Sequence, residues 1–185
     1  QQPHPNSGCG YIDGGRSDLL QAAILSSTLL CSLVAGFVLA FAAVVMPGIG
    51  NLNDHDALQA FKAMDRIIQD NQPVFMIVWV GSVVALAISA VLSIWQLDGA
   101  LRFQVLLAAA IYLLGVQLPT ITINVPLNNH LQAQDLDRLN EHEIAELWTN
   151  FGPRWRRWNT VRTVFATLTS ALLILTVLGV QSALS

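Results

Sequence analysis

The sequence predicts an all-α integral membrane protein, a bundle of four transmembrane helices with short amphipathic helices in its two longer loops. Of its 185 residues 54% are hydrophobic and only 11% are charged, where a soluble domain carries about 25% charged residues. The charges are also bunched. Four blocks without Asp, Glu, Lys or Arg are found at residues 19–53, 71–97, 103–129 and 163–185. Each is long enough to cross a bilayer, for which about 20 apolar residues suffice.

These counts exclude a soluble enzyme and a disordered chain, and a net charge of −3 excludes a nucleic-acid binder. Because backbone polar groups in lipid must be satisfied within the segment, we expect the four blocks to be helices. We expect a polar tail at residues 1–18 and one membrane domain at residues 19–185. The spans of this domain are predicted at about 19–46, 74–97, 101–123 and 153–181.

The boundaries of the spans follow from local signals. The first block is too long for the 7–15-residue core of a cleavable signal peptide, so we interpret it as a retained span that ends at Pro47. Pro73 precedes the second span, and the short turn after it makes the second and third spans antiparallel neighbours. Gly152-Pro153 opens the fourth, since proline suits a first helical position. Small residues recur every four positions, a spacing that lets membrane helices approach closely: Ser32, Gly36 and Ala40 in the first span, and Gly81, Ala85, Ser89 and Ser93 in the second.

Basic residues predict the orientation. The loops after the first and third spans hold seven of the nine basic residues, Lys62, Arg66, Arg138, Arg154, Arg156, Arg157 and Arg162. By the positive-inside rule, loops 47–73 and 124–152 are expected in the cytoplasm of a bacterial cell, with both termini across the cytoplasmic membrane.

The loop after the first span predicts an amphipathic helix on or near the membrane surface. Asn53 and Asp54 are N-capping residues, and apolar residues then recur at helical spacing. The polar face opposite carries Lys62, Asp65, Arg66 and Gln69, which we expect to be solvated.

The segment after the third span holds most of the polar chemistry. Pro119 removes a backbone hydrogen bond, so we expect the helix to kink or end there. The polar residues Thr120, Thr122, Asn124, Asn128, Asn129 and His130 follow. Irregular backbone at this depth is tolerated only when it is buried in protein or lines a cavity. The segment is therefore predicted to be a pocket wall.

The fourth span supplies a matching face. At 100° per residue, Trp155, Trp158, Asn159 and Arg162 lie within about 100° of arc. Arg162 has an apolar run directly after it, and an ionisable residue at such a position is a functional-site candidate that faces the interior, although a side chain that snorkels to lipid phosphates remains an alternative. A short amphipathic helix is predicted between the two segments, over residues 133–148. His142 and Glu146 are spaced i, i+4 there, but no di-iron or zinc-protease motif accompanies them, and we expect no metal.

Six residues carry a family resemblance: Asn124, Pro126 and Asn128 after the third span, and Trp155, Asn159 and Arg162 in the fourth. In these motifs the chain resembles the anthrone-oxygenase-like membrane proteins, over about residues 25–180. The resemblance implies a four-span membrane protein. Some members of the family oxidise anthrones to anthraquinones.

The resemblance further implies a monooxygenase without a cofactor, because the anion of an anthrone can pass an electron directly to oxygen. Such an enzyme holds a flat aromatic molecule, supplies a base and stabilises an oxyanion. Under this hypothesis Trp155 and Trp158 stack on the rings, and Arg162 stabilises the negative charge. His130, of the residue type that accepts protons near neutral pH, is the base. The oxygens of the ligand are bound by the asparagines Asn124, Asn128, Asn129 and Asn159.

Two alternatives stay open. In the first alternative the chain is an accessory subunit that packs against a larger membrane complex, or it forms a homo-oligomer. The polar cluster then only holds the third and fourth spans together. Transport is a third interpretation, but the sequence shows no inverted repeat and no charged pair inside the membrane. The expected partners are therefore the lipid bilayer, a planar hydrophobic molecule and a membrane complex, with no nucleic acid.

Overall fold

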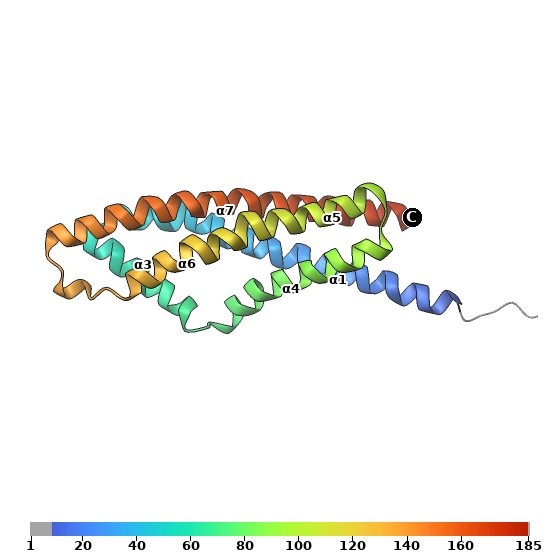
Figure 1. Cartoon of the computed structure of the whole chain (residues 1–185), viewed down its shortest axis with the longest axis horizontal. Helices are drawn as coiled ribbons and strands as arrows, with labels where there is room; N and C mark the ends of the chain where they lie inside the picture. Colours follow the sequence, from blue (N-terminus) through green and yellow to red (C-terminus); the bar gives the residue numbers. More distant parts are fainter. Residues whose placement is uncertain (1–8, 185) are drawn as a thin grey trace, which may run out of the picture.

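The chain folds into an elongated bundle of four long helical segments, with both ends of the described chain at one end of the bundle and the longer loops at the other (Figure 1). The computed structural model describes the backbone of residues 9–184 and the side chains of residues 18–182. Four helical segments are long and apolar enough to cross a membrane, beginning at Asp18, Pro73, Gly99 and Glu141. The predicted all-α, four-span membrane fold is confirmed.

The first helical segment comprises α1 (Cys9–Ala40), a π-helical turn η1 (Phe41–Val45) and α2 (Met46–Ile49). Helix α1 begins at Cys9, so the backbone of the second half of the predicted polar tail is helical. The rest of that tail, residues 1–8, lies outside the described residues. The second span is α4 (Pro73–Gln96), and Gln72 caps it by accepting a hydrogen bond from the backbone of Phe75 at 2.6 Å.

The third span does not break at Pro119. It runs as α5 (Gly99–Tyr112), the π-helical turns η2 (Leu113–Gln117) and η3 (Thr120–Asn124), and α6 (Val125–Gln132), without a loop. The two π-helical turns flank the proline, and in each the closing backbone N–H bonds to a carbonyl five residues earlier. These wider turns accommodate the proline ring and its missing donor, which is how membrane helices commonly tolerate proline. The expected irregular segment is therefore helical, and helical geometry decides which of its side chains face inward.

The helix that contains the predicted fourth span begins earlier than that span. Helix α7 (Glu141–Leu184) has 44 residues and contains Pro153 in its interior. The predicted amphipathic helix at 133–148 is thus split between a short 3₁₀ turn, η4 (Leu136–Arg138), and the first turns of α7. At 1.5 Å per residue α7 is about 66 Å long, roughly twice the hydrocarbon thickness of a bilayer. Its first half therefore extends beyond the lipid core and supports the loop end of the bundle.

Close helix packing holds the spans together. Helix α7 packs against α1 and α5, and α1 packs against α4. A Cβ atom added to Gly115 would lie 2.3 Å from the ring of Phe165, so glycine is required where the third span meets α7. Buried hydroxyls add interhelical hydrogen bonds, as between Ser82 and the Tyr112 hydroxyl at 2.6 Å. Such bonds satisfy polar groups that would otherwise face apolar surroundings.

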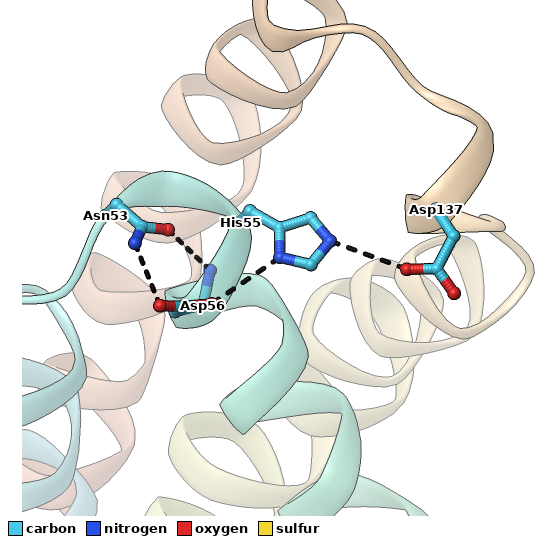
Figure 2. A network of polar contacts seen from close by, with 4 residues as sticks. All are labelled: Asn53, His55, Asp56 and Asp137. Carbon is cyan, nitrogen blue, oxygen red and sulfur yellow. Dashed lines mark hydrogen bonds and ion pairs between the residues drawn. The ribbon is translucent and has the colours of Figure 1, made fainter.

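Helix α3 (Asp54–Gln69) closes the loop end of the bundle. Asn53 caps it by accepting the backbone N–H of Asp56 at 2.9 Å, as the sequence predicts. His55 then bridges this first turn to η4, with its ring nitrogens 3.5 Å from an oxygen of Asp56 and 3.7 Å from one of Asp137 (Figure 2). Helix α3 packs its apolar face on α6 and α7, and Phe61 lies in that face. The helix is thus an amphipathic cap on the bundle rather than a free surface helix.

Candidate functional site

A cavity of about 230 Å³ lies between α3 and the ends of the four spans. Phe75 and Trp79, in the first two turns of α4, lie in its wall. Fourteen residues line the cavity: Phe37, Phe41, Phe61, Asp65, Ile68, Phe75, Trp79, Thr120, Asn124, Val125, Asn128, Trp155, Asn159 and Arg162. Six of these residues are aromatic, six are polar or charged, and two are aliphatic.

Arg162 is the buried cation of this site. It lies midway along α7, with only 6% of its surface exposed. One terminal nitrogen donates to Asn159 Oδ1 at 2.8 Å, and the other donates to Thr120 Oγ1 at 3.1 Å. Its guanidinium carbon lies 5.6 Å from the centre of the Trp155 ring, a cation–π distance. Neutral oxygens and an indole face therefore surround the guanidinium, and no carboxylate within the described residues pairs with it.

Asn159 fixes the geometry of this arginine. Its side-chain nitrogen donates to the backbone carbonyl of Val38 in α1 at 2.9 Å. Because the nitrogen of the Asn159 amide is used in that bond, its oxygen Oδ1 faces Arg162 and accepts from the guanidinium. One side-chain amide therefore connects α1 to Arg162. Because Asn159 is almost completely buried, the arrangement is shielded from solvent and preorganised.

Asp65 is buried, with 4% of its surface exposed, where the sequence interpretation expected a solvated residue. Three side-chain amides donate to its carboxylate. Gln69 and Gln132 donate to Oδ2 at 2.7 and 3.0 Å, and Asn128 donates to Oδ1 at 2.7 Å. Because α6 presents amides to α3, the polar face of the amphipathic helix turns partly inward at this residue. Asp65 and Arg162 are the two charged side chains buried within residues 18–182, and both line the cavity.

Asn128 connects the two halves of the site. Its Oδ1 accepts the indole N–H of Trp155 at 2.8 Å while its Nδ2 donates to Asp65. Contacts therefore run continuously from Asp65 through Asn128 and Trp155 to Arg162, because the guanidinium of Arg162 lies over the Trp155 ring. The orientation of the Trp155 ring is therefore set by polar contacts as well as by packing.

Aromatic rings make up much of the cavity wall. Phe75 and Trp79 of α4 are stacked, with ring centres 5.4 Å apart and planes 21° apart. Phe37 of α1 packs against both, at 5.3 and 6.5 Å. Phe37 also lies 4.9 Å from Phe41, and Trp155 contacts Phe41 at 5.7 Å and Phe61 at 5.1 Å. Tilted and stacked rings of this kind form a surface that suits a flat aromatic ligand.

Two polar atoms of the cavity residues have no hydrogen-bond partner although they are buried. They are Oδ1 of Asn124, an acceptor, and Nε of Arg162, a donor. Asn124 uses its other end in a weak contact of 3.5 Å with the backbone carbonyl of Trp155. A buried polar group without a partner is costly, so a ligand that satisfies these atoms gains binding free energy.

Five of the eight residues predicted for the site meet at the cavity: Asn124, Asn128, Trp155, Asn159 and Arg162. The other three do not line it. Asn129 and His130 are exposed, because the segment is helical and they project away from the face that Asn124 and Asn128 share. Trp158 is half-buried beside the cavity rather than in its wall.

A second, apolar cavity of about 290 Å³ adjoins the first on the outer surface of α1 and α4. Phe37, Phe75 and Trp79 line both cavities. The other walls include Leu33 and Val74, which are exposed on apolar stretches of the spans. Three aromatic side chains therefore separate the polar cavity from the lipid-facing surface.

A model of the family described as anthrone oxygenase matches residues 73–172, just over half of the chain. The chain belongs to the anthrone oxygenase family. No curated protein and no solved structure matches it.

The segment shared with the anthrone oxygenase family runs from the start of α4 into the second half of α7. It contains all five of the predicted residues that line the cavity. Asp65 and the three phenylalanines Phe37, Phe41 and Phe61 lie outside it. Their part in the site therefore follows from the structure of this chain.

Sequence reasoning missed Asp65 and the aromatic residues of the cavity wall other than Trp155. Asp65 lies on the polar face of an amphipathic helix, and nothing in that spacing indicates that its carboxylate is buried. Its partners Asn128 and Gln132 are more than sixty residues away in the sequence. Phe37, Phe75 and Trp79 look like ordinary lipid-facing residues of a span. As for metals, the described residues contain no group of three or more His, Cys, Asp or Glu side chains arranged to hold an ion.

Proposed function

We propose that this small membrane protein binds a flat aromatic ketone of the anthrone type in its cavity and oxidises it with molecular oxygen. The observation that carries the proposal is the pairing of aromatic walls with a buried guanidinium that has no anionic partner. Membership of the anthrone oxygenase family gives the reaction class.

The cavity suits a compact planar ligand. Its volume of about 230 Å³ is just below the range of about 300–1,000 Å³ typical of small-molecule pockets. Trp155, Phe75 and Trp79 all line the cavity, so a fused-ring ligand bound in it contacts aromatic surfaces. Asn124 Oδ1 accepts a hydroxyl of the ligand, which satisfies an otherwise unpartnered atom.

Arg162 stabilises the charge that develops during the reaction. Loss of the acidic ring proton of an anthrone places negative charge on its carbonyl oxygen, and this anion is the species that donates an electron to oxygen. A guanidinium held by Asn159 and Thr120 points preorganised donors at that oxygen in a site of low polarity. The anion in turn supplies the counter-charge that the buried arginine lacks.

The test is turnover of an anthrone under oxygen by the purified protein in lipid nanodiscs, followed by the absorbance of the anthraquinone. Loss of one oxyanion donor costs about 10²-fold to 10³-fold in rate, so Arg162→Ala and Asn159→Ala are expected to fall by about that factor. Arg157→Ala, an exposed position on the same helix, is the matched control. Equal turnover in Arg162→Ala and wild type at equal protein level contradicts the proposal.

An accessory role in a larger membrane assembly is the second candidate, and one observation favours it. The small-residue stripe of α1 faces outward, since Gly36 and Ala40 are exposed and a Cβ at Gly36 would meet nothing within 4 Å. Another membrane helix fits against such a stripe. Purification from native membranes in mild detergent distinguishes the candidates: migration with a large complex supports the subunit, and a small particle that oxidises anthrones supports the enzyme.

We also propose that the loop end of the bundle faces the cytoplasm of a bacterial cell. Arg162 is buried and does not count toward the charge bias. Arg66, Arg154, Arg156 and Arg157 remain exposed at that end, near the lipid boundary. The loop end thus has more exposed basic residues than the opposite end, and the positive-inside rule places such an end in the cytoplasm.

A further inference from the structure

We infer that Asp65 is the base that takes the acidic proton from the bound aromatic ketone. The inference rests on the proposed function and adds a catalytic residue on α3, outside the segment that matches the family. Asp65 and Arg162 are the two titratable side chains among the fourteen that line the cavity. His130, the base expected from the sequence, is exposed and lines no part of it.

The hydrogen bonds of Asp65 leave it able to accept a proton. A carboxylate has about four lone-pair positions. Oδ2 accepts two bonds, from Gln69 and Gln132, and Oδ1 accepts one, from Asn128. Oδ1 therefore retains a lone pair, on a residue whose side chain borders the cavity.

The three partners of Asp65 are neutral amides, and no lysine, arginine or histidine within the described residues lies within ion-pair distance of it. Protonation of the carboxylate therefore breaks no ion pair. A structural buried carboxylate is usually paired with a cation. Asp65 instead shares its cavity with Arg162 without touching it, so a ligand that lies between them presents its acidic C–H to one and its oxygen to the other.

The reaction balances with oxygen as the oxidant. Asp65 takes a proton from the ring methylene, so a C–H bond breaks and an O–H bond forms while the electron pair moves into the ring system toward the carbonyl near Arg162. The anion passes one electron to oxygen, and the resulting radical and superoxide combine to a peroxide anion, which regains the proton from Asp65. Asp65 then removes the second methylene proton, the O–O bond breaks, and the new carbonyl forms. The departing hydroxide takes that proton and leaves as water.

The experiment isolates proton transfer from oxidation. Wild-type protein in nanodiscs is incubated anaerobically in D₂O with anthrone, and deuterium uptake at the methylene is followed by NMR. A general base contributes about 10²-fold to 10⁴-fold, so Asp65→Asn is expected to slow the protein-catalysed exchange at least 10²-fold. Asp70→Asn makes the same chemical change at an exposed position at the end of α3 and is expected to exchange at the wild-type rate.

Binding separates a failure of the inference from a failure of the proposed function. Exchange and turnover in Asp65→Asn at the wild-type rate overturn the inference and leave the proposed function standing. A wild-type protein that neither quenches its tryptophan fluorescence with anthrone nor oxidises it overturns the proposed function itself.

A measurement on the wild type covers the case in which Asp65→Asn does not fold. Anaerobic addition of anthrone is expected to produce, in the infrared difference spectrum, a protonated-carboxyl band with loss of a carboxylate band, and Asp65→Glu is expected to shift that band. A spectrum in which anthrone anion forms without a protonated carboxyl overturns the inference.

Discussion

The indole nitrogen of Trp155 donates a hydrogen bond of 2.8 Å to the side-chain oxygen of Asn128. This bond joins α7 to α6 in the cavity wall and fixes which end of the Asn128 amide faces Asp65. The Trp155 indole and the buried carboxylate of Asp65 are therefore oriented by one side-chain amide.

Replacing the indole while keeping a ring tests this arrangement. Trp155→Phe leaves the oxygen of Asn128 without its donor, so we expect a loss of about 1–3 kcal/mol in the free energy of unfolding. We also expect weaker binding of anthrone. Denaturant unfolding in mixed micelles measures the first and fluorescence titration the second. Trp158→Phe, outside the cavity wall, is the control, and equal losses in the two variants would show that the bond to Asn128 is unimportant.

The contact between the third span and α7 predicts a strongly position-dependent effect of alanine. In Gly115→Ala the added Cβ meets Phe165 at 2.3 Å, and overpacking of this kind costs about 1–3 kcal/mol. Gly36→Ala on α1 has open space and is expected to be neutral or slightly stabilising, because alanine favours a helix. Thermal unfolding in the same detergent compares the two. A Gly115→Ala protein as stable as Gly36→Ala would mean that the helices sit farther apart.

The pair formed by Ser82 and Tyr112 predicts non-additive losses. Ser82 also donates to the carbonyl of Trp79 at 2.7 Å, so the Tyr112 hydroxyl donates to Ser82. Ser82→Ala removes the acceptor that lies 2.6 Å from that buried hydroxyl, whereas Tyr112→Phe leaves Ser82 bonded to Trp79, so the serine variant is expected to cost more. The double variant is expected to cost less than the two single losses added together. Additive losses in a double-mutant cycle would contradict the pairing.

The proposed orientation is tested by labelling two exposed aspartates at opposite ends of the bundle. In a protein with Cys9 replaced by serine, cysteine is introduced at Asp98 or at Asp137, whose side chains are highly exposed. Cys31 is fully buried and is expected to stay unlabelled. A membrane-impermeant maleimide is expected to label position 98 in intact bacteria and position 137 only after lysis. The reverse pattern places the loop end outside.

The fold was predictable because the amino-acid composition of the four charge-free blocks determines it. Charge-free blocks of more than 20 residues can only be helices in lipid, and the four blocks became the four spans. The boundaries were harder. Pro119 and Pro153 are strong stop signals in soluble helices, yet both lie inside continuous helical segments. Around Pro119 the wider turns η2 and η3 accommodate the missing donor.

The candidate site was predictable where one helix carries it. Trp155, Asn159 and Arg162 share a face of α7, and their 3–4-residue spacing is visible in the sequence. The prediction of His130 depended on an irregular chain after Pro119. In a helix His130 lies about 200° around from Asn128, so it faces outward when Asn128 faces inward. Asp65 required tertiary information, since Gln69 is its neighbour on α3 but only the packing of α3 on α6 brings Asn128 and Gln132 to it.

Phe37, Phe75 and Trp79 form an aromatic partition between the two cavities, and this partition determines which ligand concentration governs binding. An oily, planar molecule that passes this partition is drawn from the bilayer, where it dissolves, and not from the buffer. The concentration that governs occupancy is then its mole fraction among the lipids. Saturation curves taken at different amounts of lipid or detergent are expected to coincide only on that scale, and dilution with empty vesicles is expected to act as an inhibitor.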